Sequence, residues 1–518
     1  MHRPLPLPVL LALTALTAGL LAPVVPSAAV AASPGPARPA YATIEGSGST
    51  GAELLVQQWI ADVDATGLRV VYTGGGATKG RRDFAQDTVD FAVSEIGFQG
   101  TTDSGPGDDS GGRGFAYLPL TAGGLAFAYQ LHDRRGTPVR NLRLSGATLA
   151  RIFTGGITRW NDPAITADNN GRVLPDTPIT PVVHAEGSGL TAQLTTWMDT
   201  AHPDVWRPYF GRAGHTSSYP RETATMVGQS GSDAVVSVVT GRAGEGSIGY
   251  VEYPYAVNRD APVAKILNAA GYYVAPTPSN VAVALTAATL NHTDDPDTDL
   301  TQDLEPVYAN PDRRAYPLSS YTYAIIPTDS ADPRMTTGKR QTLADFLTYA
   351  LCAGQQKATP YGFAPLTLNL VQAGFDQVAR LGQADPNVVI DDRDLSTCDN
   401  PTFDGSDPDR DVLAETAPQP AACDAQGAGP CGTVPPRSFD GVDISPAPRV
   451  GDTVRALLTG RGTYPARYRW RLDGRPVPGA SGARLRLRPA FVGQRLTVRV
   501  TALGTTLTSP PRRVRPAR

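Results

Sequence analysis

Three glycine-rich turns stand at the starts of predicted helices. Two of them share the tetrapeptide EGSG, at residues 45–48 and 186–189, and each follows a short apolar stretch and opens a run with helical periodicity. The third is TGGGATKG, at residues 73–80. Such a turn leaves backbone N–H groups free at the helix start, where the helix dipole adds partial positive charge. One turn of this kind is typical of a capped helix, but three that converge could bind a single small anion.

Motifs for other chemistries are missing from the sequence. The stretch GGGATKG lacks the Gly-Lys-Ser/Thr order of a P-loop, no G-x-G-x-x-G is placed to open a dinucleotide-binding fold, and no G-x-S-x-G nucleophile elbow occurs. The six histidines have neither catalytic nor ligand spacing, and there is no Cys-x-x-Cys pair to hold a metal. We therefore expect a protein that is not an enzyme and that uses no metal or cofactor.

The elements that must position these turns follow an α/β pattern. From about residue 41 to 381, short apolar runs such as LRVVY (68–72) and VDFAVS (89–94) alternate with helical patterns. Residues 386–436 are rich in Asp, Pro and Gly, which predicts an irregular linker. From Pro446 onward the apolar period changes to two, which predicts a small all-β sandwich of roughly 70 residues.

The N-terminus has the pattern of an export signal. Arg3 supplies positive charge, Val9–Leu21 an apolar core and Ala29–Ala31 a small-residue cleavage pattern, so residues 1–31 are predicted to be a signal peptide. No later stretch approaches the ~20 apolar residues that span a bilayer. The signal region contains no cysteine for a lipid anchor. The mature protein is expected to be secreted or associated with the cell surface, without a transmembrane helix.

Four cysteines fit an oxidising compartment and allow three pairings. We favour Cys352 with Cys398 and Cys423 with Cys431, because each of these pairs is nearest in sequence.

The net charge of −3 is unevenly distributed along the chain. Residues 436–518 contain 17 arginines, no lysine and 4 aspartates, a surplus of 13 positive charges that leaves −16 on the remainder. This asymmetry suggests two modules with different partners.

Residues 41 to about 385 resemble the phosphate-binding proteins that serve ABC transporters. The matching stretches occur in the family's order: GSGSTGAELLVQQW, VYTGGGATKGRRDFAQDTVDFAVSE, TLARIFTGGITRWNDPAI, PVVHAEGSGL, GSIGYVEYPYA and YPLSSYTYAII. The resemblance implies the two-lobe, type II Venus-flytrap fold of periplasmic binding proteins, in which two α/β lobes close over the anion. The first lobe would comprise residues 41–125 and 315–385, and the second residues 126–314.

The same resemblance implies ligand-binding positions in the first lobe. Gly51 stands where the family has an aromatic residue, and Ala77 where it has a serine, with Thr78 beside it as a substitute. Glu95 takes the place of the buried aspartate that accepts the phosphate proton. The full set implied for this lobe is Ser49, Thr50, Gly51, Ala77, Thr78 and Glu95.

In the second lobe the implied positions differ more from the family. His184 replaces an arginine, which removes a permanent bidentate charge. His184 could donate to the anion when protonated, but the affinity would then fall as the pH rises and the histidine loses its proton. Leu190 replaces a threonine. Cations of the third turn and the helix after it could compensate, or could simply form a solvated helix face: Lys79, Arg81 and Arg82. The positions implied for this lobe are His184, Glu186, Ser188, Gly189 and Leu190.

The C-terminal region, residues 437–513, resembles bacterial immunoglobulin-like repeats of secreted proteins. The resemblance rests on YRWRLDGRPVPGASGARLRLRPAFVGQRLTVRV, with Trp470 as the core tryptophan. The arginines make an anionic partner plausible, either a cell-wall polymer or a membrane surface, and a neutral spacer is the alternative.

The function implied is that of an extracellular solute-binding protein that binds inorganic phosphate, or a related oxyanion, for ABC-type import through a permease. The alternative is a secreted scavenging or adhesion protein that retains the fold without delivering to a transporter. A phosphoester hydrolase on the same scaffold is a third reading. We expect a monomer without a nucleic-acid partner.

Overall fold

The computed structural model describes residues 39–100, 107–222, 225–390, 395–398, 400–407, 410–432, 438–461, 466–503 and 505–517. The predicted signal peptide, residues 1–31, lies outside these ranges.

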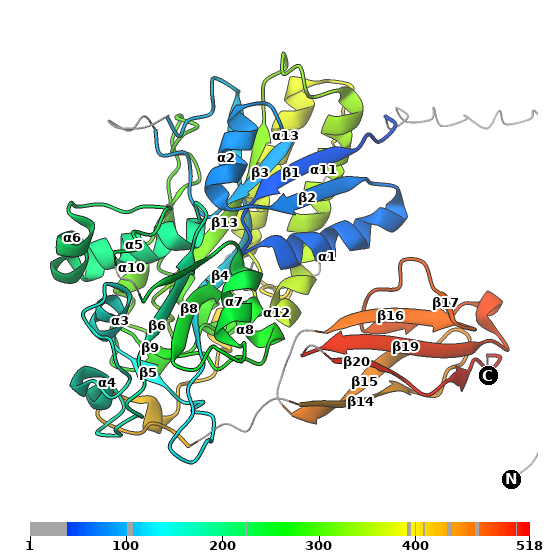
Figure 1. Cartoon of the computed structure of the whole chain (residues 1–518). Helices are drawn as coiled ribbons and strands as arrows, with labels where there is room; N and C mark the ends of the chain where they lie inside the picture. Colours follow the sequence, from blue (N-terminus) through cyan, green and yellow to red (C-terminus); the bar gives the residue numbers. More distant parts are fainter. Residues whose placement is uncertain are drawn as a thin grey trace, which may run out of the picture. The chain divides into compact units, whose positions relative to one another are not determined.

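A sheet of eight strands runs through the α/β part of the chain (Figure 1). In spatial order it consists of β2 (Val70–Gly74), β1 (Ile44–Gly48), β3 (Phe91–Ser94), β13 (Ser319–Pro327), β4 (Phe115–Tyr129), β8 (Ser247–Glu252), β6 (Thr180–His184) and β7 (Val227–Gln229). Small sheets are formed by β10 (Tyr273–Val274), β9 (Lys265–Leu267) and β5 (Arg143–Leu144), and by β11 (Thr289–Leu290) with β12 (Gln302–Asp303).

The long strand β4 belongs to both halves of the sheet. Its first part pairs with β13, and its last part, from Leu125, pairs with β8. Every residue of β4 is buried, as expected for a strand that has layers of structure on both faces. The pairing shifts register opposite Pro119, which has no N–H to give to the ladder. This strand therefore connects two α/β lobes.

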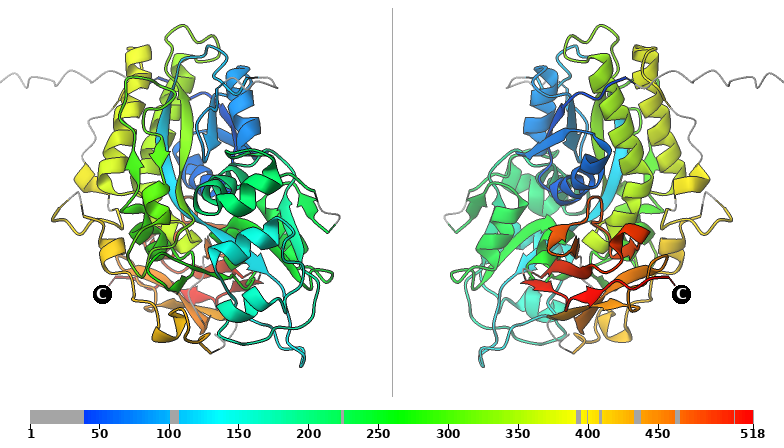
Figure 2. Two further views of the ribbon diagram at one scale, coloured as in Figure 1. Left: turned by 90° about the vertical axis from the view of Figure 1, so that its left-hand side faces the viewer. Right: turned by 90° about the vertical axis from the view of Figure 1, so that its right-hand side faces the viewer.

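Each lobe has its own apolar core. The first half of the sheet carries α1 (Glu53–Val63), α2 (Ala77–Ala85), α11 (Thr337–Leu351), α12 (Ala358–Tyr361) and α13 (Leu368–Ala384). The second half carries α3 (Gly146–Phe153), α4 (Pro163–Asp168), α5 (Gly189–Ala201), α6 (Pro203–Phe210), α7 (Ser232–Val239) and α8 (Tyr253–Asn258). Figure 2 shows α11 and α13 side by side on the outside of the first lobe. The predicted two-lobe α/β architecture is confirmed.

The division between the lobes does not follow the chain where the sequence placed it. Helix α9 (Pro278–Leu285), expected in the second lobe, buries its apolar residues in the first core. Val307, from α10 (Glu305–Tyr308), joins the same core, whereas Tyr316 and Leu318 pack in the second. The chain therefore crosses between the lobes more often than the predicted boundary at residue 315 allows.

The Asp-, Pro- and Gly-rich segment contains only short helical pieces in its described parts. They are α14 (Val412–Glu415) and the 3₁₀ turns Leu395–Cys398 and Ala422–Asp424; other such turns are Asp64–Thr66, Ala353–Lys357 and Pro489–Phe491. Cys398 is buried in the first core and forms a disulfide with Cys352. This predicted pairing is confirmed.

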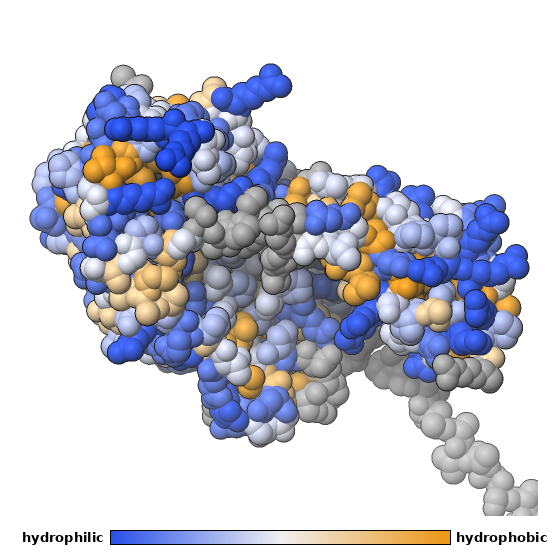
Figure 3. Space-filling view, turned by 90° about the horizontal axis from the view of Figure 1, so that it is seen from below, coloured by the Kyte–Doolittle hydropathy of each residue, from blue (hydrophilic) through white to orange (hydrophobic). Residues whose placement is uncertain are grey.

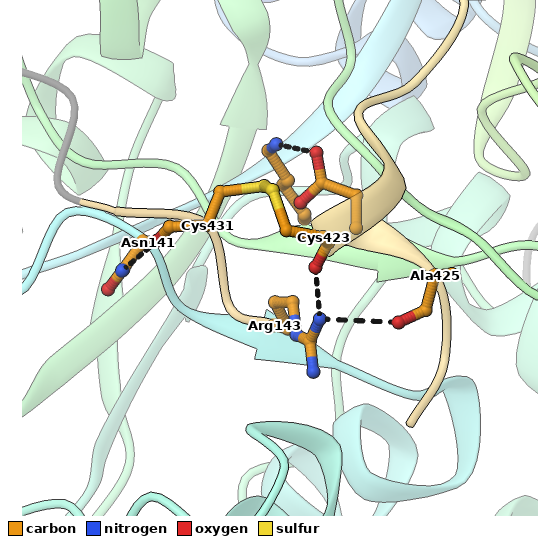
Figure 4. The surroundings of a disulfide bond; sticks show 7 residues. Asn141, Arg143, Cys423, Ala425 and Cys431 are labelled. Carbon is orange, nitrogen blue, oxygen red and sulfur yellow. Dashed lines mark hydrogen bonds and ion pairs between the residues drawn. A yellow bond between two sulfur atoms is a disulfide. The ribbon is translucent and has the colours of Figure 1, made fainter. Parts of the chain in front are cut away.

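The second predicted disulfide, Cys423–Cys431, is also confirmed, and the loop that it closes binds the second lobe. Figure 4 shows Arg143 pointing at backbone carbonyls of this loop: Nη1 donates to Cys423 at 3.0 Å and to Ala425 at 3.5 Å. Asn141 donates to the carbonyl of Cys431 at 2.6 Å. The expected linker is therefore irregular but packed, because it is fixed to the first lobe at one end and to the second at the other.

The C-terminal part is all β, as predicted. One sheet consists of β14 (Ser438–Ser445), β15 (Thr453–Arg461) and β18 (Arg484–Arg486). The other consists of β17 (Arg475–Pro476), β16 (Arg467–Leu472), β19 (Arg495–Ala502) and β20 (Thr505–Thr508), with β21 (Arg512–Arg513) paired to β19. Residues from both sheets form one apolar cluster, which includes the buried Trp470. Within the described ranges we find no helix with the length and apolar character that a membrane span requires.

Candidate functional site

The first glycine-rich turn leads from β1 into α1 and requires glycine. Gly48 has φ of +135°, and a Cβ there would lie 2.1 Å from the carbonyl oxygen of Val93. The N–H of Ser49 donates to the same carbonyl at 2.8 Å, and its Oγ accepts from the N–H of Ala52 at 3.1 Å. The buried Ser49 hydroxyl donates to the carboxylate of Glu95. The turn thus directs a hydroxyl at the predicted acid.

The second and third turns, one from each lobe, touch each other. The N–H of Thr78 donates to the carbonyl of Gly187 at 3.1 Å. A Cβ on Gly76 would lie 2.6 Å from the same oxygen, so no larger residue fits there. Ser188 caps helix α5 by accepting from the N–H of Thr191 at 3.4 Å. Two helix N-termini therefore face each other across the boundary between the lobes.

Glu95 lies where the turns meet. It is 1 % exposed, and a Cβ on Gly189 would lie 1.9 Å from its Oε2, so the carboxylate rests against the first residue of α5. The side-chain amides of Gln193 and Gln302 donate to its backbone carbonyl at 2.9 and 3.1 Å. In this conformation the Glu95 carboxylate lies against the N-terminus of α5, the end of a helix that favours an anion.

A second buried acid, Glu252 at the end of β8, lies beside the first turn. A Cβ on Gly51 would be 2.8 Å from Cγ of Glu252 and 3.2 Å from Oε1 of Glu95. The N–H of Tyr253 donates to the Glu252 carboxyl group. Oε2 of Glu252 is buried without a partner among the described residues. Glu252 was not predicted. It ends the apolar run GSIGYVE, much as Glu95 follows the run VDFAVS, and this position at a strand end is the signal that could have marked it.

The surroundings raise the pKa of both acids, and that of Glu252 more than that of Glu95. Burial, and then the charge of Glu95, raise the pKa of Glu252 well above its ordinary value. Burial also raises the pKa of Glu95, and the hydrogen bond from Ser49 and the charges of Arg81 and His184 offset part of that effect. Two buried carboxyl groups so close together cannot both carry charge without a large cost.

Both ring nitrogens of His184 contact other groups of the protein. Its Nδ1 lies 2.6 Å from Oε1 of Glu186, and its Nε2 lies 3.2 Å from the carbonyl oxygen of Tyr250. Burial acts to raise the pKa of Glu186, but the hydrogen bond and charge of His184 outweigh it and the pKa is lowered. The interpretation of His184 as a donor to the anion therefore does not describe this conformation, because neither ring nitrogen faces an open position.

The cations expected to compensate for the lost arginine are largely paired. Lys79 forms an ion pair with Asp83, and Arg82 is exposed. Arg81 is buried and binds Asp108 with its Nε at 3.0 Å and its Nη2 at 2.7 Å. Arg81 is thus part of the structure beneath the third turn, and its charge reaches Glu95 only at a distance.

The remaining predicted positions divide between the site and the cores. Thr50 lies across the lobe boundary from α7, with its Oγ1 3.4 Å from both the N–H and the hydroxyl of Ser232. Ser232 was not predicted; a third Gly-Ser helix start, QSGSDAVV, is the signal that marks it. The Ala77 side chain is fully buried and offers no donor. Leu190 packs into the second core and can offer only its backbone.

A cavity of about 380 Å³ opens beside this cluster and is lined by Glu95, Gln193, Gln302 and His215, among others. It also carries the acids Asp297 and Asp303. The site as a whole combines hydroxyl and helix-N-terminal donors with buried carboxyl acceptors. Such a set suits an oxyanion that still carries a proton, because that proton can be donated to a carboxylate.

A family model described as a PBP superfamily domain matches residues 33–353. The phosphate-binding protein PstS of Xylella fastidiosa is 30% identical over 333 residues, which cover 64% of this chain and 83% of the relative. The phosphate-binding protein PstS 2 of Mycobacterium tuberculosis is 30% identical over 329 residues, covering 62% and 83%. A crystal structure of a phosphate-binding protein from Stenotrophomonas maltophilia covers 64% of this chain and 92% of that one, at 19% identity and a TM-score of 0.47.

Proposed function

The chain belongs to the PBP superfamily, and we propose that it is a solute-binding protein that binds inorganic phosphate, or a closely related oxyanion, between its two lobes. The observation that carries the proposal is the meeting of three glycine-rich turns, contributed by both lobes, around Glu95.

The chemistry of these turns supports a protonated oxyanion. The Thr78 hydroxyl and the backbone at Gly189 supply uncharged donors, while Glu95, which accepts from Ser49, supplies an acceptor for the proton that phosphate retains near neutral pH. The ligand takes the place at the α5 N-terminus where the Glu95 carboxylate rests in this conformation. Binding then requires that Oε2 of Glu95 move away from Gly189 while Oε1 keeps the hydrogen bond from Ser49, and that the carboxylate accept the ligand's proton.

We further propose that the protein works outside the cell and delivers phosphate to an ABC-type permease. The support is the predicted signal peptide at residues 1–31 and the similarity to the phosphate-binding proteins PstS and PstS 2. The lobes are proposed to follow the bounds expected from the sequence, residues 41–125 with 315–385 and residues 126–314, except that α9 and Val307 belong to the first lobe and Tyr316 and Leu318 to the second. The C-terminal domain, residues 437–513, is proposed to be immunoglobulin-like, because two antiparallel sheets share one core around Trp470.

Small-angle X-ray scattering tests the proposed function. A monomer that closes over its ligand should show a smaller radius of gyration at saturating phosphate than without it. Sodium sulfate at equal ionic strength is the control and should leave the radius unchanged. No change with phosphate, or the same change with sulfate, would contradict specific closure around phosphate.

A further inference from the structure

The sheet β16–β19–β20 of the C-terminal domain has two sharply different faces. Residues alternate along each strand, so that Trp470 and Leu472 of β16 and Val498 and Val500 of β19 point into the core. The side chains between them point outward, and Figure 3 shows long hydrophilic side chains at the surface of this domain, on the right of the view.

The outward face consists of arginine and threonine alone. The register of the three strands places on it Arg467, Arg469, Arg471, Arg495, Thr497, Arg499, Thr501, Thr506 and Thr508. Every one of these side chains donates hydrogen bonds, and none is a carboxylate that could neutralise the guanidinium groups. We call these nine residues the Arg/Thr face.

Two of its arginines lie directly opposite each other. Arg469 pairs in register with Arg499, and Arg467 with Thr501. Like charges opposite one another destabilise a sheet. Neither Arg469 nor Arg499 has a carboxylate partner among the described residues. Arg467, Arg469, Arg499 and Thr501 together line a hollow of about 280 Å³.

We propose that the Arg/Thr face binds a phosphodiester polymer of the cell wall, with a phosphate group seated between Arg469 and Arg499. A guanidinium fork matches the oxygens of a phosphate, which would also relieve the repulsion between the two arginines. Because Arg467, Arg469 and Arg471 repeat along one strand, a polymer with phosphates at intervals can engage several of them at once.

The composition of the face favours this partner over other polyanions. It carries no aromatic side chain on which a nucleic-acid base could stack. The large apolar side chains that are exposed in the described part of this domain, Leu457 and Val492, lie outside the three strands, so the face has nothing to insert into a bilayer. The face also belongs to a different domain from the glycine-rich turns, so it can be tested whether or not phosphate binds between the lobes.

The test measures co-sedimentation of the full mature protein with purified cell walls. One variant is Arg469→Gln with Arg499→Gln. The matched control is Arg455→Gln with Arg484→Gln, an exposed pair that is also directly opposed, but in the other sheet of the same domain. Both variants lose the same net charge. We expect the first to bind walls about tenfold more weakly and the second to stay within about twofold of the wild type, and walls stripped of their phosphodiester polymer should bind none of them well.

Four results would overturn the proposal. They are an equal loss in both variants, unchanged binding of the first variant, undiminished binding to stripped walls, and stronger binding to phosphatidylcholine–phosphatidylglycerol vesicles than to walls. Thermal melting checks the fold of each variant. If the Gln pair does not fold, Arg469→Lys with Arg499→Lys keeps the charge but loses the planar fork, and it should still bind walls less tightly than the control.

Discussion

Replacing Glu95 by glutamine should narrow the preference for phosphate over sulfate. Near neutral pH phosphate can donate its remaining proton to a carboxylate, whereas sulfate has none to donate and meets an unpaired, repelling charge. Glu95 is 1 % exposed and rests against Gly189, so water cannot relieve that repulsion. An amide in its place can turn its NH₂ toward either anion.

The magnitude follows from this burial. Leaving one buried polar group without a partner costs about 1–3 kcal/mol, so the ratio of the two dissociation constants should fall by about tenfold, which is roughly 1.4 kcal/mol and lies within that range. The change should come mainly from tighter sulfate binding.

Isothermal titration calorimetry with both anions at pH 7 measures the ratio. The control is Glu53→Gln, which removes a half-buried carboxylate of the same turn region that accepts from the N–H of Gly74 at 3.3 Å rather than from Ser49. The control should leave the ratio unchanged. An unchanged ratio in Glu95→Gln, with a native circular dichroism spectrum, would show that Glu95 does not face the ligand.

Three further changes have defined outcomes. Glu252→Gln should alter the pH dependence of stability, because the pKa of Glu252 is raised in the folded state. Above the ordinary carboxyl pKa, the wild type should lose up to about 1.4 kcal/mol of unfolding free energy per pH unit. The variant should lack that loss in urea titrations at several pH values. Gly48→Ala should lower the unfolding free energy by at least about 2 kcal/mol, because a Cβ would meet the Val93 carbonyl at 2.1 Å; equal urea midpoints would contradict this. Cys398→Ser should cost roughly 2–4 kcal/mol in the same assay, and a variant as stable as the wild type would show that the bond to Cys352 does not hold the segment in place.

Much of the architecture could be predicted from the sequence because its signals are local. Apolar runs and helical periods indicate strands and helices, and the glycine-rich turns mark three helix starts. The lobe to which α9 belongs could not be predicted, because an apolar helix packs equally well on either core and only the tertiary fold decides. The packing of residues 386–432 was missed for a similar reason: Arg143 and Asn141 hold this segment through backbone carbonyls, which every sequence has.

The candidate site shows the same limit more sharply. The family resemblance implied Ser49, Glu95 and Gly189 as ligand positions, and the fold does bring them together. The contact of His184 with the Tyr250 carbonyl depends on the pairing of β6 with β8 and could not be read from one strand alone. Glu252 was passed over because a single acid at a strand end has no local partner to draw attention to it.

Calorimetric titration of the mature protein with inorganic phosphate tests whether the two lobes bind this anion. We predict saturable binding of one phosphate per chain, and weaker binding of sulfate at the same pH and ionic strength. Absence of phosphate binding by a folded protein, or sulfate binding as tight as phosphate binding, would contradict it.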